Sequence, residues 1–110
     1  SERTSALLTG MLVGVVERGH GKKAGVSGYY VAGKTGTAQI AKKNGQGYEK
    51  DIAIGSFVGY APANNPAFVI VTKLERPQGV QWAESTAAPL FGEIAKFLLQ
   101  YYEIAPERGM

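Results

Sequence analysis

Hydrophobic residues near the start of the chain follow a helical period. Leucine, methionine and valine recur every three or four residues between Leu7 and Val16, a spacing that places them on one face of an α-helix. Thr4 or Ser5 is the expected N-cap, and Gly19 is expected to end the helix. The pattern therefore predicts one amphipathic helix that ends before residue 19.

Two glycines lie inside this predicted helix, and a glycine-rich loop follows it. Gly10 and Gly14 each cost about 1 kcal/mol relative to alanine in a helix interior, so we expect another element to pack closely on their face. The loop, residues 19–28, holds His20, the only histidine of the chain. A lone histidine without a carboxylate pair predicts a loop residue and not a metal ligand.

The middle of the chain has the pattern of three β-strands. Residues 30–40, 53–61 and 67–74 are rich in β-branched, aromatic and small apolar residues. The connections, at residues 44–47 and 62–66, contain the Gly, Asn and Pro residues that favour turns. Short connections favour antiparallel neighbours. We therefore predict an antiparallel meander, in which the Phe68-Val69-Ile70-Val71 run of the third strand is buried.

A second helical pattern follows Pro77 and Gly79 and ends before Ala105-Pro106. It begins near Ser85-Thr86, with Pro89 in the first turn, where the missing N–H has no intrahelical partner in any case. We expect this helix to pack on the sheet through a wide apolar stripe. The stripe consists of Leu90, Phe91, Ile94, Phe97, Leu98, Tyr101 and Tyr102. The fold class is thus α/β (α+β), an antiparallel three-stranded meander flanked by an N-terminal and a C-terminal helix.

Composition narrows the range of functions. Hydrophobic residues make up 45% and charged residues 19% of the 110-residue chain, an ordinary globular balance. The net charge is +3, but adjacent lysines occur only in the pairs Lys22-Lys23 and Lys42-Lys43, so no nucleic-acid partner is expected. Cysteine is absent, which excludes disulfides and thiol nucleophiles. No apolar stretch reaches the roughly 18 residues of a membrane span, so we expect any membrane anchor to lie outside this chain.

One stretch carries candidate chemistry and allows two interpretations. Residues 28–35, Gly-Tyr-Tyr-Val-Ala-Gly-Lys-Thr, satisfy the G-x-x-x-x-G-K-T pattern of a P-loop. A phosphate-binding loop needs a flexible backbone between its glycines and a helix that begins at the lysine. Tyr-Tyr-Val-Ala favours an extended backbone, and Thr-Gly-Thr is a poor helix start. The context therefore favours a strand that carries the lysine, and the P-loop stays the alternative.

The second interpretation is a family resemblance. Gly33-Lys34-Thr35-Gly36-Thr37-Ala38-Gln39 resembles the Lys-Thr/Ser-Gly motif of the class B penicillin-binding proteins, the transpeptidases that cross-link peptidoglycan. The resemblance continues at residues 15–19, 56–63 and 87–91. It implies that residues 1–110 form the C-terminal part of a transpeptidase domain with the penicillin-binding transpeptidase or serine β-lactamase-like fold. A β-lactam sensor or a serine β-lactamase segment is a neighbouring alternative.

The chain departs from this family in two respects. Its serines, at positions 1, 5, 27, 56 and 85, fit neither the nucleophile motif Ser-x-x-Lys nor the second motif Ser-x-Asn. Glu84-Ser85-Thr86 also stands where relatives tend to have Gly-Gly before Ala-Ala-Pro. We therefore expect the missing motifs to precede Ser1. The chain alone is then inactive, and it needs either the remainder of its domain or self-association to be stable.

The resemblance implies specific roles for four residues. If Thr35 and Thr37 face an open strand edge, the backbone N–H of Thr37 supplies one donor of the oxyanion hole. Lys34 contributes positive potential for the substrate carboxylate and for proton movement. The hydroxyls of Thr35 and Thr37 bind that carboxylate, and Gly36 leaves room for the ligand.

The remaining expectations follow from the same resemblance. The partners are the D-Ala-D-Ala stem peptide of peptidoglycan and β-lactam antibiotics, with a cell-wall glycosyltransferase as a further candidate. No cofactor is expected, and the location is the extracytoplasmic face of the bacterial cell membrane, in cell-wall synthesis during division or shape maintenance. Four aromatic residues are candidates for lining the substrate groove: Tyr29, Tyr30, Tyr60 and Trp82. For each of them, packing is the favoured role.

Overall fold

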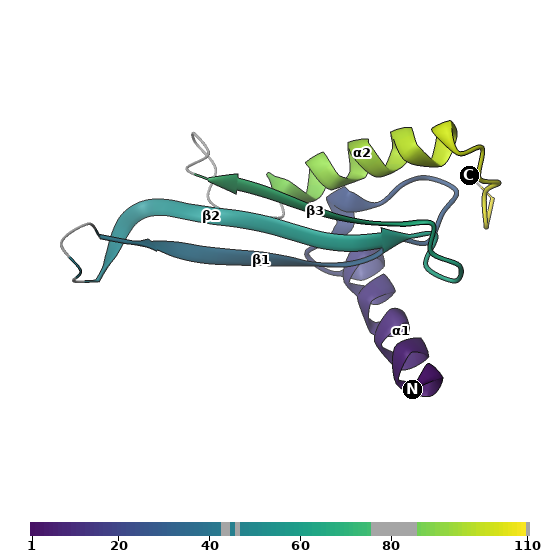
Figure 1. Cartoon of the computed structure of the whole chain (residues 1–110), viewed down its shortest axis with the longest axis horizontal. Coiled ribbons are helices and arrows are strands. Elements are labelled where there is room, and N and C mark those ends of the chain that lie inside the picture. Colours follow the sequence, from purple (N-terminus) through teal and green to yellow (C-terminus); the bar gives the residue numbers. More distant parts are fainter. Residues whose placement is uncertain (43–44, 46, 76–85, 110) are drawn as a thin grey trace.

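The computed structural model describes residues 1–42, 45, 47–75 and 86–109, leaving aside the side chains of 39–41 and 48–53. Two α-helices and three strands follow one another as predicted, and a short 3₁₀ helix lies between the first helix and the first strand (Figure 1). The elements are α1 (Glu2–Arg18), η1 (Lys22–Ala24), β1 (Ala32–Ala41), β2 (Tyr48–Ala61), β3 (Phe68–Glu75) and α2 (Ala87–Tyr101).

The sheet is the predicted antiparallel meander, with strand order β1-β2-β3. Its register pairs Thr35 with Phe57 and Phe57 with Thr72. β2 begins at Tyr48 instead of residue 53, because the β1–β2 ribbon continues pairing into a polar segment that has no hydrophobic signal. The ribbon therefore extends well beyond the helices (Figure 1).

Helix α1 begins earlier than predicted and ends where expected. Its N-cap is Ser1, whose Oγ accepts a hydrogen bond from the Thr4 backbone N–H at 3.2 Å, so a cap at Thr4 or Ser5 is wrong. Gly19 is the C-cap. The expected close packing on the glycine face is also wrong. Within the described structure, a Cβ at Gly10 would meet nothing within 4 Å, and one at Gly14 would meet only the Arg18 side chain.

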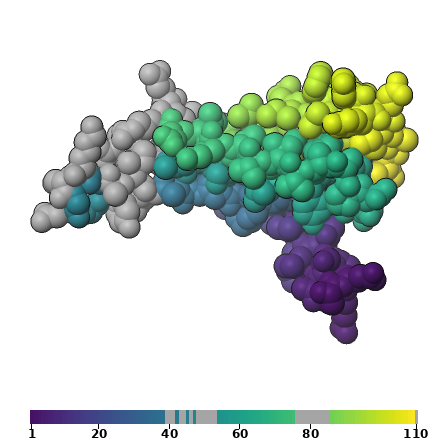
Figure 2. Space-filling model, in the orientation of Figure 1, coloured from purple at the N-terminus to yellow at the C-terminus, as the bar shows by residue number. Residues whose placement is uncertain are grey.

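The first half of α1 stands clear of the rest of the molecule (Figure 2). Leu7 and Leu8 on this half, and Met11 just after it, are each more than half exposed. A groove of about 740 Å³ separates α1 from the outer face of the sheet, with Thr9 and Val13 on one side and Tyr60 and Val69 on the other. The helix thus meets the sheet mainly through its C-terminal end.

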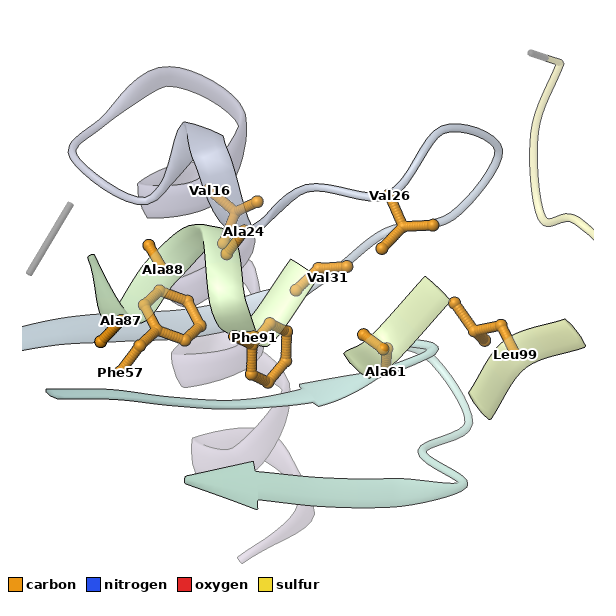
Figure 3. Close-up of a cluster of buried hydrophobic side chains, with 11 residues drawn as sticks. Val16, Ala24, Val26, Val31, Phe57, Ala61, Ala87, Ala88, Phe91 and Leu99 are labelled. Carbon is orange, nitrogen blue, oxygen red and sulfur yellow. The ribbon is translucent and has the colours of Figure 1, made fainter. Parts of the chain in front are cut away.

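The core lies between α2 and one face of the sheet, and its centre is a pair of phenylalanine rings. Phe57 and Phe91 are fully buried, with ring centroids 4.7 Å apart. Smaller side chains from the helices, the loop and β2 surround them (Figure 3). The prediction that the last helix packs on the sheet is therefore confirmed.

The face that α2 uses differs from the predicted stripe. Phe97 is 62% and Tyr101 68% exposed, and Leu90 and Tyr102 are exposed as well. Small residues pack instead, because they let the helix approach closely: a Cβ at Gly92 would lie 3.0 Å from the Lys23 carbonyl oxygen. The buried residues of α2 are Ala87, Ala88, Phe91, Gly92, Ala95 and Leu99.

The continuous buried run predicted for the third strand is also wrong. Exposure alternates along β3, with Val69 68% and Val71 66% exposed, because α2 covers only one face of the sheet. Phe68 and Ile70 pack against the core. Thr72 is buried, and its hydroxyl donates a hydrogen bond to the Ala87 carbonyl at 2.7 Å.

The segment after α2 folds back onto the residues just before β1, and we call residues 104–108 the C-terminal strap. The backbone N–H groups of Glu107 and Arg108 donate to the Gly28 carbonyl at 2.8 and 3.2 Å. The Glu107 carboxylate accepts from the Tyr30 backbone N–H at 2.8 Å. The Tyr29 hydroxyl donates to the Ile104 carbonyl. Four hydrogen bonds therefore join the strap to residues 28–30.

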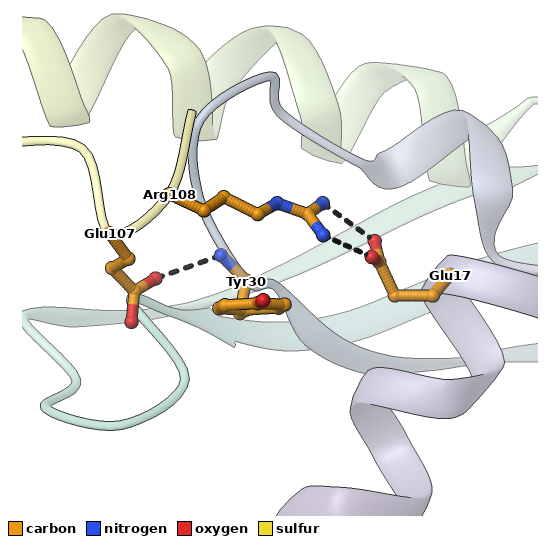
Figure 4. A network of polar contacts seen from close by, with 4 residues as sticks. All are labelled: Glu17, Tyr30, Glu107 and Arg108. Atoms are coloured by element: carbon orange, nitrogen blue, oxygen red, sulfur yellow. Dashed lines mark hydrogen bonds and ion pairs between the residues drawn. The ribbon is translucent and has the colours of Figure 1, made fainter. Parts of the chain in front are cut away.

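Arg108 joins the strap to α1 as well (Figure 4). Its guanidinium donates two hydrogen bonds to the Glu17 carboxylate, at 2.5 and 3.0 Å, and lies 4.3 Å from the centroid of the Tyr30 ring. The hydrogen bond from Arg108 lowers the pKa of the Glu17 carboxyl, and the charges of Arg108 and Arg18 act in the same direction, while partial burial opposes them.

The packing around Phe57 predicts a strong contrast between two glycine substitutions. A Cβ at Gly33 would overlap the Phe57 ring and lie 2.8 Å from the Val58 carbonyl oxygen, so Gly33→Ala should lower the free energy of unfolding by about 1–3 kcal/mol. Gly10→Ala should raise it by up to about 1 kcal/mol, because it removes a helix-interior glycine without a clash. Urea unfolding of the complete protein with each substitution checks this. If the two substitutions changed the free energy of unfolding equally, the structure would accommodate a methyl group at position 33 without strain at the Phe57 ring.

The Glu17–Arg108 ion pair predicts a pH dependence of stability. The folded-state pKa of Glu17 is lowered from its ordinary value of 4.5, so the ion pair stabilises the fold fully above that value. Its contribution disappears as the pH falls through the lowered pKa. Urea unfolding of the complete protein from about pH 7 to about pH 3 should show Glu17→Gln less stable than the unsubstituted protein at neutral pH and equally stable in acid. Glu93→Gln, on the exposed side of α2, is the control, and a pH-independent gap would show that the ion pair is not its cause.

Candidate active-site strand

The four predicted site residues are consecutive in the middle of β1. They pair with four residues of β2: Lys34 with Val58, Thr35 with Phe57, Gly36 with Ser56, and Thr37 with Gly55. No described strand pairs with the other edge of β1. The Lys34–Thr37 segment therefore forms one rim of the described sheet.

The side chains of this segment alternate between the two faces of the sheet. Thr35 and Thr37 lie on the face of Phe57, towards α2, whereas Lys34 and Gly36 lie on the opposite face with Val58 and Ser56. Lys34 and Thr37 are exposed, and Thr35 and Gly36 are partly exposed. All four residues are accessible from solvent.

One side-chain hydrogen bond indicates which backbone groups face the free edge. The Ser56 hydroxyl, on β2, donates to the Gly36 carbonyl at 3.4 Å, so this carbonyl is directed towards β2. Neighbouring residues on an antiparallel strand direct their N–H and C=O groups to opposite sides. The backbone N–H and C=O of Thr35 and Thr37 accordingly point to the free edge. This is the orientation on which the oxyanion-hole prediction depends.

Lys34 brings a positive charge to the same edge. Its ammonium donates to the Thr35 carbonyl at 3.1 Å and to the Thr35 hydroxyl at 3.3 Å. The long side chain thus starts on the outer face of the sheet and turns around the rim. The result is one cation, two hydroxyls and outward backbone donors along a single short edge, an arrangement suited to an extended ligand with a carboxylate.

Glycine at position 36 has a local reason in the structure. A Cβ there would lie 2.8 Å from the Ser56 Oγ. Gly36 therefore makes room for Ser56 on the neighbouring strand, a role that the sequence pattern does not reveal. Only the strand register shows it, because Ser56 lies 20 residues away. Room for a ligand at Gly36 stays a prediction.

The aromatic candidates do not gather at this edge. The Tyr60 hydroxyl lies 2.6 Å from the Thr9 hydroxyl on α1. Tyr29 and Tyr30 contact the C-terminal strap. These three residues therefore have packing roles, as favoured from the sequence, and Trp82 lies outside the described residues.

The P-loop alternative is excluded by the local structure. The lysine of the G-x-x-x-x-G-K-T pattern lies inside β1, which continues to Ala41. A phosphate-binding loop would need a helix N-terminus at this point. In the described part of the chain, no group of three or more His, Cys, Asp or Glu residues could hold a metal ion, and neither helix is long and apolar enough to cross a membrane.

Comparison with known proteins identifies the family. Residues 1–96 match the family described as the penicillin binding protein transpeptidase domain. The chain belongs to this family. The resemblance predicted from the sequence is thus confirmed, and the family match extends over α1, all three strands and the first part of α2.

Individual relatives agree with this assignment. Stage V sporulation protein D of Bacillus subtilis is 39% identical over 99% of this chain and 17% of its own length. Peptidoglycan D,D-transpeptidase FtsI of Escherichia coli K12 is 38% identical over 81% of this chain and 15% of its length. Among solved structures, penicillin-binding protein 3 of Mycobacterium tuberculosis in complex with ampicillin has a TM-score of 0.79 at 37% identity, covering 90% of this chain and 24% of that one.

These relatives confirm the predicted fold, a part of the penicillin-binding transpeptidase fold. The chain spans less than a fifth of the length of the two relatives matched by sequence. It therefore corresponds to one section of a longer polypeptide in those relatives.

Proposed function

We propose that this chain is the C-terminal part, residues 1–110, of the transpeptidase domain of a peptidoglycan D,D-transpeptidase. In this proposal the Lys34–Thr37 segment of β1 forms one wall of the catalytic cleft. The observation that carries the proposal is the free edge of β1, where the backbone of Thr35 and Thr37 points outward beside the Lys34 ammonium.

The substrate binds as an additional strand. An extended peptide such as the D-alanyl-D-alanine end of a stem peptide pairs with an open strand edge through its main chain. The outward N–H and C=O groups of Thr35 and Thr37 provide the partners. A β-lactam antibiotic binds in the same place because it resembles this dipeptide. In support, penicillin-binding protein 3 of Mycobacterium tuberculosis has been crystallised as a complex with ampicillin.

Each site residue then has a defined task. The Thr37 backbone N–H is one of two oxyanion-hole donors, a type of group whose loss costs about 3 kcal/mol of transition-state stabilisation. The hydroxyls of Thr35 and Thr37 bind the substrate carboxylate. Lys34 supplies positive potential to that carboxylate and to proton movement at the serine of the second motif.

The nucleophile comes from another part of the protein. The serines of this chain lack the Ser-x-x-Lys context, and acylation requires a serine that a neighbouring base activates. The chain alone is therefore inactive. The remainder of the domain also covers apolar surface that this chain leaves exposed, such as Val69 and Val71. In its absence the chain self-associates through the open edge of β1.

The same proposal sets the cellular context. The enzyme acts at the extracytoplasmic face of the bacterial membrane, with its anchor outside this chain, and a cell-wall glycosyltransferase is its candidate partner. A β-lactam sensor or serine β-lactamase would use the same edge. Slow deacylation together with transfer to an acceptor peptide would distinguish the transpeptidase from both.

The site roles predict a specific pattern of acylation in the complete protein. Lys34→Ala should slow acylation by a β-lactam at least about tenfold, and Thr37→Ala should weaken acylation mainly for ligands with the carboxylate, because a charge-assisted hydrogen bond contributes about 1.5–3 kcal/mol. Stopped-flow acylation with a carboxylate-bearing ligand and its ester measures both effects.

Two matched variants serve as controls for this experiment. Lys73→Ala removes an exposed lysine from β3, where it pairs with Glu75, and should leave acylation unchanged. Thr37→Ser keeps the hydroxyl and should retain most of the activity. If Thr37→Ala slowed the acid and the ester equally, the hydroxyl would have no role in carboxylate binding.

A further inference from the structure

The C-terminal strap holds the residues just before β1, which the sheet does not pair. Gly28 has a φ of +92°, a conformation that favours glycine, and its carbonyl accepts both strap N–H groups. Tyr30 donates its N–H to Glu107 and accepts from the Ala63 N–H at 2.8 Å through its carbonyl. The backbone just before β1 is therefore fixed largely by residues that follow α2.

The strap also fixes this backbone relative to α1. Arg108 covers the Tyr30 ring and binds the last turn of α1 through Glu17 with both branches of its guanidinium. A planar guanidinium that is both stacked and bidentate holds its partners in one geometry. Helix, strand and strap therefore meet at Tyr30 (Figure 4).

The position of Tyr30 bears directly on the site. An extended strand rises about 3.3 Å per residue, and Tyr30 lies only four residues before Lys34. β1 pairs with β2 on one side only in the described sheet. Between Tyr30 and Lys34, Gly33 packs tightly on the Phe57 ring. The contacts at Tyr30 and Gly33 together set the position and direction of the Lys34–Thr37 segment.

We propose that Glu107 and Arg108 are positioning residues for the transpeptidase site, which hold the backbone at Tyr30, two residues before β1, and thereby place the Lys34–Thr37 edge. The proposal rests on the function proposed above. Catalytic groups must be held within about 0.5 Å of their productive positions. The strap lies beyond residue 96, where the family match ends, so membership of the family does not by itself assign these two residues a role.

The test uses the complete protein and separates binding from acylation. Arg108→Met, Glu107→Met and Glu17→Gln are compared with Arg3→Met and Glu93→Gln, which change exposed residues outside the strap. Methionine at position 107 removes the oxygen that accepts from the Tyr30 N–H. With a fluorescent penicillin, the acylation rate constant should fall about tenfold in each of the first three variants, called the strap variants because they change the strap or its partner Glu17. The dissociation constant of the preceding complex should change less than about twofold. The two controls should match the unsubstituted protein.

Two further variants exclude simple destabilisation. Ile70→Ala, on β3 and away from the strap, lowers stability by removing a side chain that packs on the core; at a similar loss of melting temperature it should acylate normally. Glu17→Gln combined with Arg108→Met should lose little more activity than the more impaired single variant, because both changes break the same ion pair. Arg108→Lys keeps the positive charge but loses the two-pronged guanidinium. Its acylation rate constant should lie between those of the unsubstituted protein and Arg108→Met.

The outcomes are distinguishable. Failure of the unsubstituted protein to acylate would overturn the proposed function itself. Normal acylation in all three strap variants, or equal slowing in Ile70→Ala, would overturn the positioning role while leaving the proposed function intact. A lower acylation rate constant in the strap variants, with the control variants unchanged, would establish the positioning role.

Discussion

The packing of β1 directly onto the Phe57 ring is the contact on which the rest of the structure depends. A Cβ at Gly33 would overlap this ring, and one at Gly59 would lie 2.9 Å from both Phe57 and Phe91. Strand β1, strand β2 and helix α2 therefore meet with no side chain between the backbones and the two rings. Any residue with a side chain at position 33 would lift β1 away from the core, one residue before Lys34.

This packing leaves the functional groups at the rim of a rigid layer. Gly33 packs on the Phe57 ring, and β2 pairs with one edge of β1. The other edge of β1 is open in the described structure. The outward backbone groups of Thr35 and Thr37 then need no side-chain chemistry to receive an extended ligand. In the proposed site, Lys34 and the two hydroxyls add charge and specificity. The proposed site thus places its donors on a strand, where positions are more precise than on a loop.

The sequence predicted those features that depend on local pattern or on short motifs. Helix α1, the meander and the packing of α2 on the sheet followed from period and turn residues, and the family followed from Gly33-Lys34-Thr35-Gly36-Thr37. The buried face of α2 was mispredicted because periodicity favours large apolar residues, whereas Gly92 and Ala95 face the core. The run at Val69 was predicted as buried because one sequence does not show that only one face of the sheet is covered.

The strap could not be predicted for a different reason. Glu17 and Arg108 are 91 residues apart, and neither lies in a motif or a periodic pattern that links them. The tail after α2 contains Pro106 and Gly109 and has the composition of a loop. Contacts of this kind depend on where the tail is directed once α2 has packed. Only the tertiary structure brings Glu17 and Arg108 together beside Tyr30.

The most direct test of the proposed site is the structure of the complete protein acylated by a β-lactam. We predict that the ligand lies along the free edge of β1, with the acyl carbonyl oxygen about 2.7–3.1 Å from the Thr37 backbone nitrogen and the ligand carboxylate at the Thr35 and Thr37 hydroxyls. A ligand held elsewhere, or a Thr37 N–H bonded to another strand of the protein, would contradict this prediction.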